Sequence, residues 1–294
     1  MSILSPLLLL AVCLVGISGF PTIIASSSPR MRVSFLDASV ASGDTVVVVG
    51  GTGGVGQLVT KKLASRGDLT VKATSRSKQK GIDLIDDDAV EVVALDLVND
   101  DEATINKIIE GANALVISVG TTAFPTQRWA GGNTPEAVDK VAVSRIATAA
   151  SSVPSMKKIV LVTSVGVDRT KEMPFLILNL FGVLDAKKSG EDAVKKAATD
   201  GGFEYAIVRP GRLVGGPFTN LDIAKLLKVE GGAENGVDVA QGDSLLGDCK
   251  RDACAEAIVQ CLVNDACTNV EFSLASNDEK ALSDEQWTQA FQSL

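Results

Sequence analysis

The sequence predicts an α/β fold in which helices cover both faces of a parallel, doubly wound sheet. Short runs of β-branched residues, of which Thr45–Val49 (TVVVV) is the clearest, show no alternation of apolar and polar residues. Both faces of such strands are therefore expected to be covered. Segments with apolar residues at helical spacing separate these runs, and strands that alternate with helices form parallel sheets.

The helices and strands can be placed in chain order. The helix after the first strand carries apolar residues at helical spacing until Gly67 ends it. Thr134 is the expected N-cap of a later helix, which begins at Pro135 and ends near Ala150. The remaining expected elements are strands at 69–74, 90–95, 114–119, 159–163, 205–208 and 270–274, and a helix at 101–110.

The composition narrows the class of protein. The 294 residues are 46% hydrophobic and 22% charged, with a net charge of −8, which is typical of a globular protein that folds without disulfides or metals. The absence of histidine excludes Ser-His-Asp hydrolases, histidine-ligated metal sites and imidazole acid–base catalysis. The acidic balance argues against nucleic acid as a partner, because phosphate binding requires a basic surface.

Two N-terminal segments have the composition of targeting sequences. Residues 1–19 contain an apolar run that ends in small residues, as a signal peptide does, and that is too short for a membrane span. Residues 20–43 carry seven Ser or Thr, two Arg and one acid, as transit peptides do. Together they resemble the bipartite leader of algae with secondary plastids, which predicts a location in the plastid stroma or at the thylakoid. A plain secretory leader is the alternative. Residues 44–294 contain no linker and are expected to form one domain.

A glycine-rich loop, GGTGGVG at 50–56, joins the first strand to the first helix. Glycine permits the tight turn, the approach of a pyrophosphate to the backbone and close helix–strand packing. The helix N-terminus adds free N–H donors and the positive end of its dipole. Strand, loop and helix in this order predict a dinucleotide site, and a turn that binds nothing is the alternative.

The residues after the second and third strands bear on the choice of dinucleotide. An acid at the end of the second strand would bind the ribose hydroxyls of NAD, but the sequence there is TSRSK at 74–78. Arg76 among hydroxyl groups favours the 2′-phosphate of NADP(H), and a solvated polar loop is the alternative. Asp96, which follows the third strand, is interpreted either as an acceptor for the adenine amino group or as a turn former.

Four cysteines lie near the C-terminus, at positions 249, 254, 261 and 267. Their spacings contain no CxxC pair, and Cys254 and Cys261 are seven residues apart on an apolar helix face. Buried, reduced thiols are therefore expected rather than a metal site or disulfides.

Two further segments each allow two interpretations. The apolar run 174–184 (PFLILNLFGVL) is too short to span a bilayer. It is expected to be a buried helix over the nicotinamide pocket, with a membrane or partner patch as the alternative. Trp129, beside Arg128, is either part of a lid over the substrate or an anchor for its long loop.

Several longer strings resemble a known family. They are VVVVGGTGGVG, ALDLVND, IVLVTSVG, YAIVRPGRL and QGDSLLGDCKR. They resemble the atypical short-chain dehydrogenase/reductases. Two further strings, GTTAFPTQRWAGGNTPEAVD and PFLILNLFGVLDAKKSGED, resemble more narrowly a plastid NAD(P)-binding subfamily of plants and algae. The resemblance covers about residues 45–292. That subfamily is related to the Rossmann domain of a chloroplast import protein and to NmrA-like redox sensors. The resemblance implies a seven-stranded Rossmann sheet with a small C-terminal substrate lobe.

The resemblance also implies roles for individual positions. Ser164 matches the active-site serine of the family, and Lys187 matches the lysine of its YxxxK motif. An ordinary strand-end serine and a solvated lysine beside Lys188 are the alternatives. The implied cofactor-binding residues are Gly50, Thr52, Gly53, Gly54, Val55 and Gly56 at the pyrophosphate, Arg76 at the 2′-phosphate, Asp96 and Leu97 beside the adenine, Ser118, Val119 and Gly120 along the ribose and nicotinamide, and Pro210 and Gly211 over the nicotinamide.

The sequence departs from the family at the tyrosine of that motif. Val183 stands four residues before Lys187 and has no proton to give. Tyr205, the single tyrosine, begins the sixth expected strand, where an aromatic side chain serves core packing. The usual Ser-Tyr-Lys proton relay is therefore absent, although hydride transfer is the cofactor's own chemistry and can use water as the proton source.

Two functions follow from these residues. The first is an NADPH-dependent oxidoreductase that transfers hydride to a small hydrophobic acceptor, whose identity the sequence does not reveal. The second is a non-catalytic NADP(H)-sensing or scaffold module with a plastid protein partner. The intact glycine loop serves both, whereas the missing tyrosine favours the second.

Overall fold

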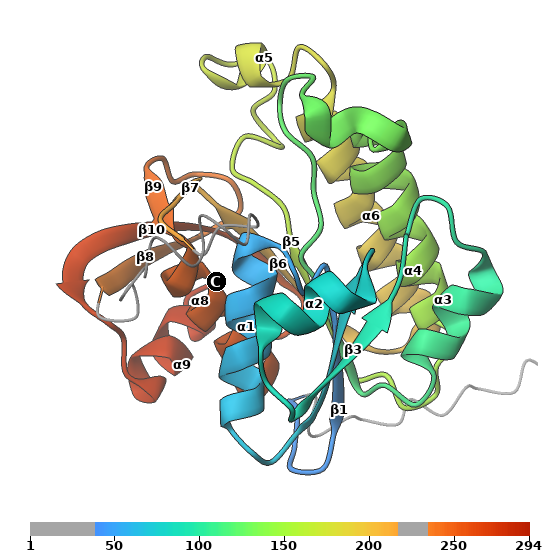
Figure 1. Cartoon of the computed structure of the whole chain (residues 1–294). Coiled ribbons are helices and arrows are strands. Elements are labelled where there is room, and N and C mark those ends of the chain that lie inside the picture. Colours follow the sequence, from blue (N-terminus) through green and yellow to red (C-terminus); the bar gives the residue numbers. More distant parts are fainter. Residues whose placement is uncertain (1–38, 217–234) are drawn as a thin grey trace, which may run out of the picture. The chain divides into compact units, whose positions relative to one another are not determined.

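The computed structural model describes residues 39–216 and 235–294 (Figure 1). The expected signal peptide and nearly all of the expected transit peptide lie outside these residues. The described part of the chain contains an eight-stranded sheet in the order β3-β2-β1-β4-β5-β6-β10-β8. The strands are β1 (Thr45–Val49), β2 (Thr70–Ser75), β3 (Val90–Ala94), β4 (Ala114–Ile117), β5 (Lys158–Val162), β6 (Glu204–Pro210), β8 (Asn235–Gln241) and β10 (Val270–Lys280).

Neighbouring strands in this sheet are parallel except at one edge, where β8 pairs with β10 in antiparallel fashion. The expected parallel, doubly wound sheet is confirmed, but it has eight strands rather than the seven implied by the resemblance, because β8 was not predicted from the sequence. A second, two-stranded sheet pairs β7 (Arg212–Val214) with β9 (Asp248–Lys250). Strand order reverses at β1, which lies between β2 and β4. Ligands of open α/β sheets bind at such a reversal, beyond the carboxyl ends of the strands.

Helices cover both faces of the sheet, and each face has its own apolar core. The helices are α1 (Gly54–Ser65), α2 (Lys78–Ile85), α3 (Glu102–Ile109), α4 (Val143–Ala150), α5 (Phe175–Leu178), α6 (Val183–Gly201), α8 (Arg251–Val263) and α9 (Asp284–Gln292). A short 3-10 segment, η1 (Gln127–Gly132), and a π-helical segment, η2 (Glu136–Ala142), complete them. The Thr134 hydroxyl accepts a hydrogen bond from the Ala137 amide at 3.2 Å, so the expected N-cap is confirmed.

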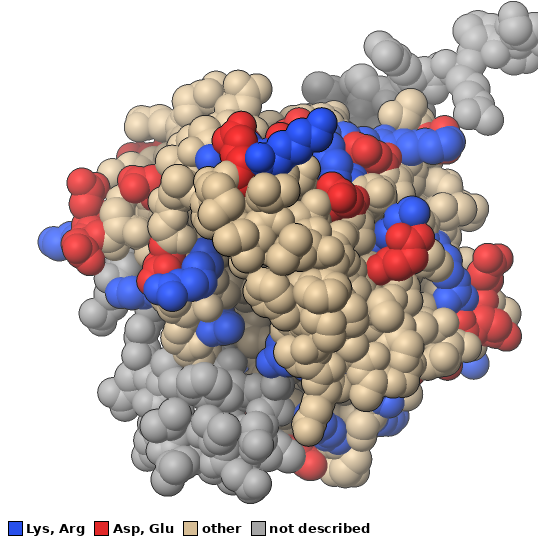
Figure 2. Space-filling model, turned by 90° about the horizontal axis from the view of Figure 1, so that it is seen from above, with Lys and Arg blue, Asp and Glu red and all other residues tan. Residues whose placement is uncertain are grey.

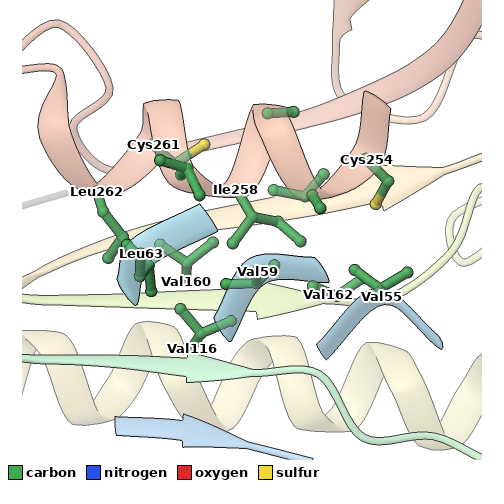
Figure 3. Packing of buried hydrophobic residues seen from close by; sticks show 14 of the residues in the cluster. Val55, Val59, Leu63, Val116, Val160, Val162, Cys254, Ile258, Cys261 and Leu262 are labelled. Carbon is green, nitrogen blue, oxygen red and sulfur yellow. The ribbon is translucent and has the colours of Figure 1, made fainter. Parts of the chain in front are cut away.

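The core on the α1 and α8 side shows how the two helices hold the sheet. Val59 of α1 and Ile258 of α8 are fully buried beside Val116 and Val160 of the sheet (Figure 3). Burying each such side chain typically contributes about 1.5–3 kcal/mol. The four C-terminal cysteines are free and buried in this core, as expected. None of the described helices has the length and hydropathy of a transmembrane span.

Candidate functional site

A cleft runs across the carboxyl ends of the strands on both sides of β1. It consists of two hollows of about 320 and 530 Å³ that share part of their lining. We call the smaller one the β2 end, because residues after β1, β2 and β3 line it, and the larger one the β5 end, because residues after β4, β5 and β6 line it. The shared lining residues are Gly53, Ser118, Val119, Gly120, Thr121 and Arg128.

The structure brings the residues implied by the resemblance together in this cleft. The β2 end adds Gly50, Thr52, Arg76, Asp96 and Leu97 to the shared set. The β5 end adds Gly54, Val55, Ser164, Lys187, Pro210 and Gly211. Gly56 is the exception. It lies beneath the loop, where an added Cβ would come within 2.2 Å of the Gly50 carbonyl oxygen. Gly56 therefore allows α1 to pack closely against the loop.

The glycine loop presents open backbone at the start of α1. Gly50 adopts a φ of +82°, and its amide donates to the Thr74 hydroxyl at 3.2 Å. The Gly53 amide donates to the Gly50 carbonyl at 2.9 Å and closes the turn. Gly53 is the N-cap of α1 and has no capping side chain, and the first turn of α1 holds no acid. The N–H groups and positive dipole end of α1 are therefore free to bind an anion, and the backbone cradle fits a pyrophosphate.

Besides the shared Arg128, two cations line the β2 end of the cleft. Arg76 follows β2, and Lys80 lies four residues later in the first turn of α2. Neither Arg76 nor Lys80 forms an ion pair with a carboxylate among residues 39–216 and 235–294. The Ser75 hydroxyl already has a partner, because it donates a hydrogen bond to the Ser77 carbonyl at 2.8 Å. The sequence identified Arg76 but not Lys80. The available signal was that Lys80 lies in the first turn of the helix that begins two residues after Arg76.

Asp96 forms a turn at the β2 end. Its carboxylate accepts hydrogen bonds from the Val98 amide at 3.1 Å, from the Asn99 amide at 3.3 Å and from the Asn99 side chain at 2.9 Å. Burial raises the pKa of Asp96, but these hydrogen bonds and the charge of Arg76 outweigh burial and hold it below its usual value. The turn-forming interpretation is confirmed, and the contact with an adenine stays a prediction.

Lys187 is held in a buried contact at the β5 end. Its ammonium lies 2.6 Å from one oxygen of Asp139, and the other oxygen accepts from the Thr121 amide at 3.1 Å and from the Thr121 hydroxyl. The side chains of Asp139 and Lys187 are only 2% and 12% exposed, so the interpretation of Lys187 as a solvated lysine is wrong. Gly120 leaves room for the pair, because a Cβ there would come within 2.9 Å of the ammonium.

Sequence reasoning missed Asp139. It lies in the π-helical segment Glu136–Ala142, which precedes α4. Wider turns of this kind occur often at functional sites. Pairing Asp139 with Lys187, 48 residues away, requires η2 and α6 to pack against each other, and no local pattern reveals that packing.

A second buried ion pair fixes the strand ends under the cleft. Arg209 of β6 and Glu191 of α6 are fully buried, and the guanidinium donates to both carboxylate oxygens, at 3.0 and 2.7 Å. The Thr163 hydroxyl also donates to Glu191, at 2.7 Å. Ser164 follows directly and lines the β5 end, where its hydroxyl donates to the Val165 carbonyl at 3.0 Å.

No phenol enters the described cleft. Val183 begins α6 and is 3% exposed, within a small apolar cluster that includes Phe175 and Leu184. Tyr205 packs against the core on the α4 and α6 side, as expected. Ser164 and Lys187 therefore stand at the β5 end without the tyrosine of the family motif.

The expectation of a buried helix at 174–184 is wrong. Helix α5 spans only four residues, and of its side chains Phe175 alone is buried. The exposed apolar side chains of this segment and its neighbours are Phe124, Met173, Leu176, Ile177, Leu178, Leu180 and Phe181. Figure 2 looks down on the α5 side, and uncharged side chains dominate the middle of this face.

Trp129 anchors its loop to the α5 segment. Its ring lies edge-on to Phe181 with centroids 6.0 Å apart, and its indole N–H donates to the Thr122 hydroxyl at 3.2 Å. Phe124 makes a similar edge contact with Phe181 at 6.1 Å. Trp129 lines neither hollow, so the structure favours an anchor over a lid.

Comparison with known proteins agrees with the fold and the cleft. A family described as NAD(P)H-binding matches residues 50–265. Protein TIC 62, chloroplastic, from Oryza sativa subsp. japonica is 29% identical over 225 residues, which cover 64% of this chain and 43% of the relative. The chain thus spans about two fifths of the length of this curated relative.

Two solved structures share the fold. A Bacillus halodurans protein described as an NAD-dependent epimerase/dehydratase has a TM-score of 0.64 and 19% identity, over 86% of this chain and 100% of its own. A short-chain dehydrogenase/reductase (wide type) from Veillonella parvula, in complex with NADP, has a TM-score of 0.58 and 14% identity, over 80% of this chain and 98% of its own. At these identities the likeness shows the fold alone.

Proposed function

Because this chain belongs to the NAD(P)H-binding family, we propose that it binds NADP(H) along the cleft and transfers hydride to a small hydrophobic acceptor at the β5 end. The observation that carries the proposal is the continuity of the cleft. A single lined surface leads from Arg76, past the open N-terminus of α1, to Ser164 and Lys187. We further propose a plastid location, which the chloroplastic relative and the composition of residues 1–43 support.

The preference for NADP(H) over NAD(H) rests on charge at the β2 end. Arg76 and Lys80 supply positive charge where an acid would bind the ribose hydroxyls of NAD. A charge-assisted hydrogen bond typically contributes about 1.5–3 kcal/mol. Arg76→Gln should therefore weaken NADPH binding by roughly tenfold to a hundredfold and leave NADH binding nearly unchanged.

Fluorescence titration of the full chain with NADPH and NADH tests this preference. Lys78→Gln is the matched control, because Lys78 begins α2 close to Arg76 but does not line the cleft. Equal affinities of the unaltered protein for NADPH and NADH would contradict the preference. Equal losses in the Arg76 and Lys78 variants would contradict the role of Arg76.

At the β5 end, each residue has a separate role in the proposed reduction. Bound NADPH supplies a hydride, and the reduced acceptor also takes up one proton. Asp139 holds the Lys187 ammonium beside Gly120, where it can orient the ribose of the cofactor, and the Ser164 hydroxyl can orient the acceptor. Val183 supplies no proton, so the proton comes from solvent. Turnover is then expected to vary little between about pH 6 and 8, because the chain has no histidine to titrate there.

The presence of Val183 in place of an acid also favours a second candidate function. In this alternative, the protein senses the NADP(H) redox state and passes it to a plastid protein partner without turnover. Separate titrations with NADPH and NADP⁺, followed by addition of quinones, flavins and enones, distinguish the two functions. Hydride transfer to any of these acceptors supports the enzyme, whereas unequal affinities without transfer support the sensor.

A further inference from the structure

The β5 end of the cleft is lined by four cationic side chains, and its described lining residues include no carboxylate. Two of the cations already have partners. Lys187 is paired with Asp139 at 2.6 Å, and Arg212 is paired with Asp248 at 2.7 Å. The remaining two are Arg128, from η1, and Arg251, which begins α8.

Arg128 and Arg251 both line this hollow, and neither forms an ion pair with a carboxylate among residues 39–216 and 235–294. The Arg251 guanidinium donates to the Gly215 carbonyl, an uncharged acceptor. Burial lowers the pKa of Arg251, and the positive charge of Arg128, which lines the same hollow, lowers it further. Two like charges in one hollow, in a chain whose net charge is −8, indicate a place for an anion.

The position of Arg251 in its helix strengthens this argument. A cation at a helix N-terminus is unfavourable, because that end of the dipole is already positive. Lys250, the N-cap of α8, makes no side-chain capping bond, and Asp252 is turned to Lys62 at 3.5 Å. Arg251 therefore lies at a helix end that has no capping side chain, and it lines the hollow.

The rest of the hollow is apolar. Its walls include Val55, Val119, Val162, Pro210 and Leu213. An inorganic anion would leave these side chains exposed to water, whereas an organic acid would cover them and so gain from their burial.

We propose that the hydride acceptor is an organic acid whose carboxylate binds between Arg128 and Arg251 while its apolar part covers the valine wall. Guanidinium groups bind carboxylates through two parallel hydrogen bonds, which fixes the orientation of the acid as well as its affinity. This inference rests on the proposed function, since it names the substrate class of the same site. The pyrophosphate of the cofactor competes for the same two arginines, and the experiment separates the two anions.

The test uses the full chain, saturated with NADP⁺, and isothermal titration with three probes. The first is 3-phenylpropionate, an apolar body with one carboxylate. The second is its neutral amide, and the third is inorganic phosphate. We expect the carboxylate to bind at least tenfold more tightly than the amide and than phosphate, with an affinity that falls as salt is added. Equal binding of acid and amide would overturn the proposal.

The arginines are tested by Arg128→Gln and Arg251→Gln, each expected to weaken binding of 3-phenylpropionate at least tenfold. Lys250→Gln is the matched control, because it removes a positive charge from the same helix end without lining the hollow. Arg128 is exposed on its loop, so its variant tests the proposal even where Arg251→Gln fails to fold.

The outcome for the cofactor is read separately. If the arginine variants lose at least tenfold in NADP⁺ affinity and keep their affinity for 3-phenylpropionate, the two arginines bind the pyrophosphate and the proposal is overturned. If the unaltered protein binds no NADP(H), the proposed function fails instead. Titration of 3-phenylpropionate without cofactor then still decides whether the arginine pair binds a carboxylate.

Discussion

At the β2 end of the cleft, the Asp96 carboxylate is held by its neighbours in the chain, whereas at the β5 end the Lys187 ammonium is held by a residue from a distant segment. Asp96 is fixed by the backbone two and three residues later. Lys187, by contrast, depends on Asp139, 48 residues away. The Asp96 turn therefore depends on local chain geometry, whereas the position of Lys187 depends on the packing of η2 against α6. Variants at the two ends should therefore behave differently.

The largest effect is expected from restoring a proton donor at the β5 end by Val183→Tyr. The new phenol would stand one helical turn before Lys187, on the same helix face. General acid catalysis typically contributes about 10²- to 10⁴-fold, so reduction of a carbonyl probe by NADPH should rise by that factor. Steady-state rates measured by loss of NADPH absorbance check this expectation.

Val183→Phe is the control, because it adds the ring without the hydroxyl. Val183 is buried in the same apolar cluster as Phe175, so both variants should lose a similar stability of about 1–3 kcal/mol through overpacking. Thermal melts followed by circular dichroism must show that both variants are folded before their activities are compared. A folded Val183→Tyr protein that binds NADPH but reduces carbonyls no faster than Val183→Phe would show that Lys187 does not lie at the family position.

The next largest effect is expected from Asp139→Ala, which leaves the Lys187 ammonium buried and unpaired. Removing one partner of a buried ion pair typically costs about 3–5 kcal/mol in the free energy of unfolding. Urea unfolding measures this loss. The double variant Asp139→Ala with Lys187→Met should recover much of it, because no charge is then left without a partner. No recovery would mean that the Asp139 contact with Thr121 matters more than the ion pair.

The smallest effect is expected at the β2 end, from Asp96→Asn. The pKa of Asp96 is lowered in the folded protein, so its ionised form stabilises the fold above the unfolded pKa of about 3.9. That contribution is lost as the pH falls through the lowered pKa. The free energy of unfolding of the unaltered protein should therefore fall more than that of Asp96→Asn between about pH 5 and 3. Near pH 7, the free energy of unfolding should change little with pH in both proteins. Thermal melts across this range, with Asp88→Asn as an exposed control, check it. Parallel curves for the unaltered protein and Asp96→Asn would contradict the assignment.

The same contrast explains what could be predicted from the sequence. The glycine loop, Arg76 and Asp96 depend on contacts within a few residues or on the ends of parallel strands, and pattern alone places these. Asp139 and Arg251 reach the cleft only through the packing of η2 and α8, which no local signal encodes. The apolar run 174–184 does not form the expected buried helix, because α5 makes only one turn and buries only Phe175, although apolar segments are ordinarily buried.

The reactivity of the buried thiols reports how often the native state of this protein opens. Cys254 and Cys261 of α8 have no exposed surface, and their contacts with Cys249 and Cys267, together with burial, raise their thiol pKa values. Only a thiolate that reaches solvent reacts with an alkylating reagent. The rate at which iodoacetamide labels Cys254 and Cys261 therefore measures how often α8, which covers the sheet beside the cleft, opens to solvent. A ligand that binds the native state should lower this labelling rate as its occupancy rises.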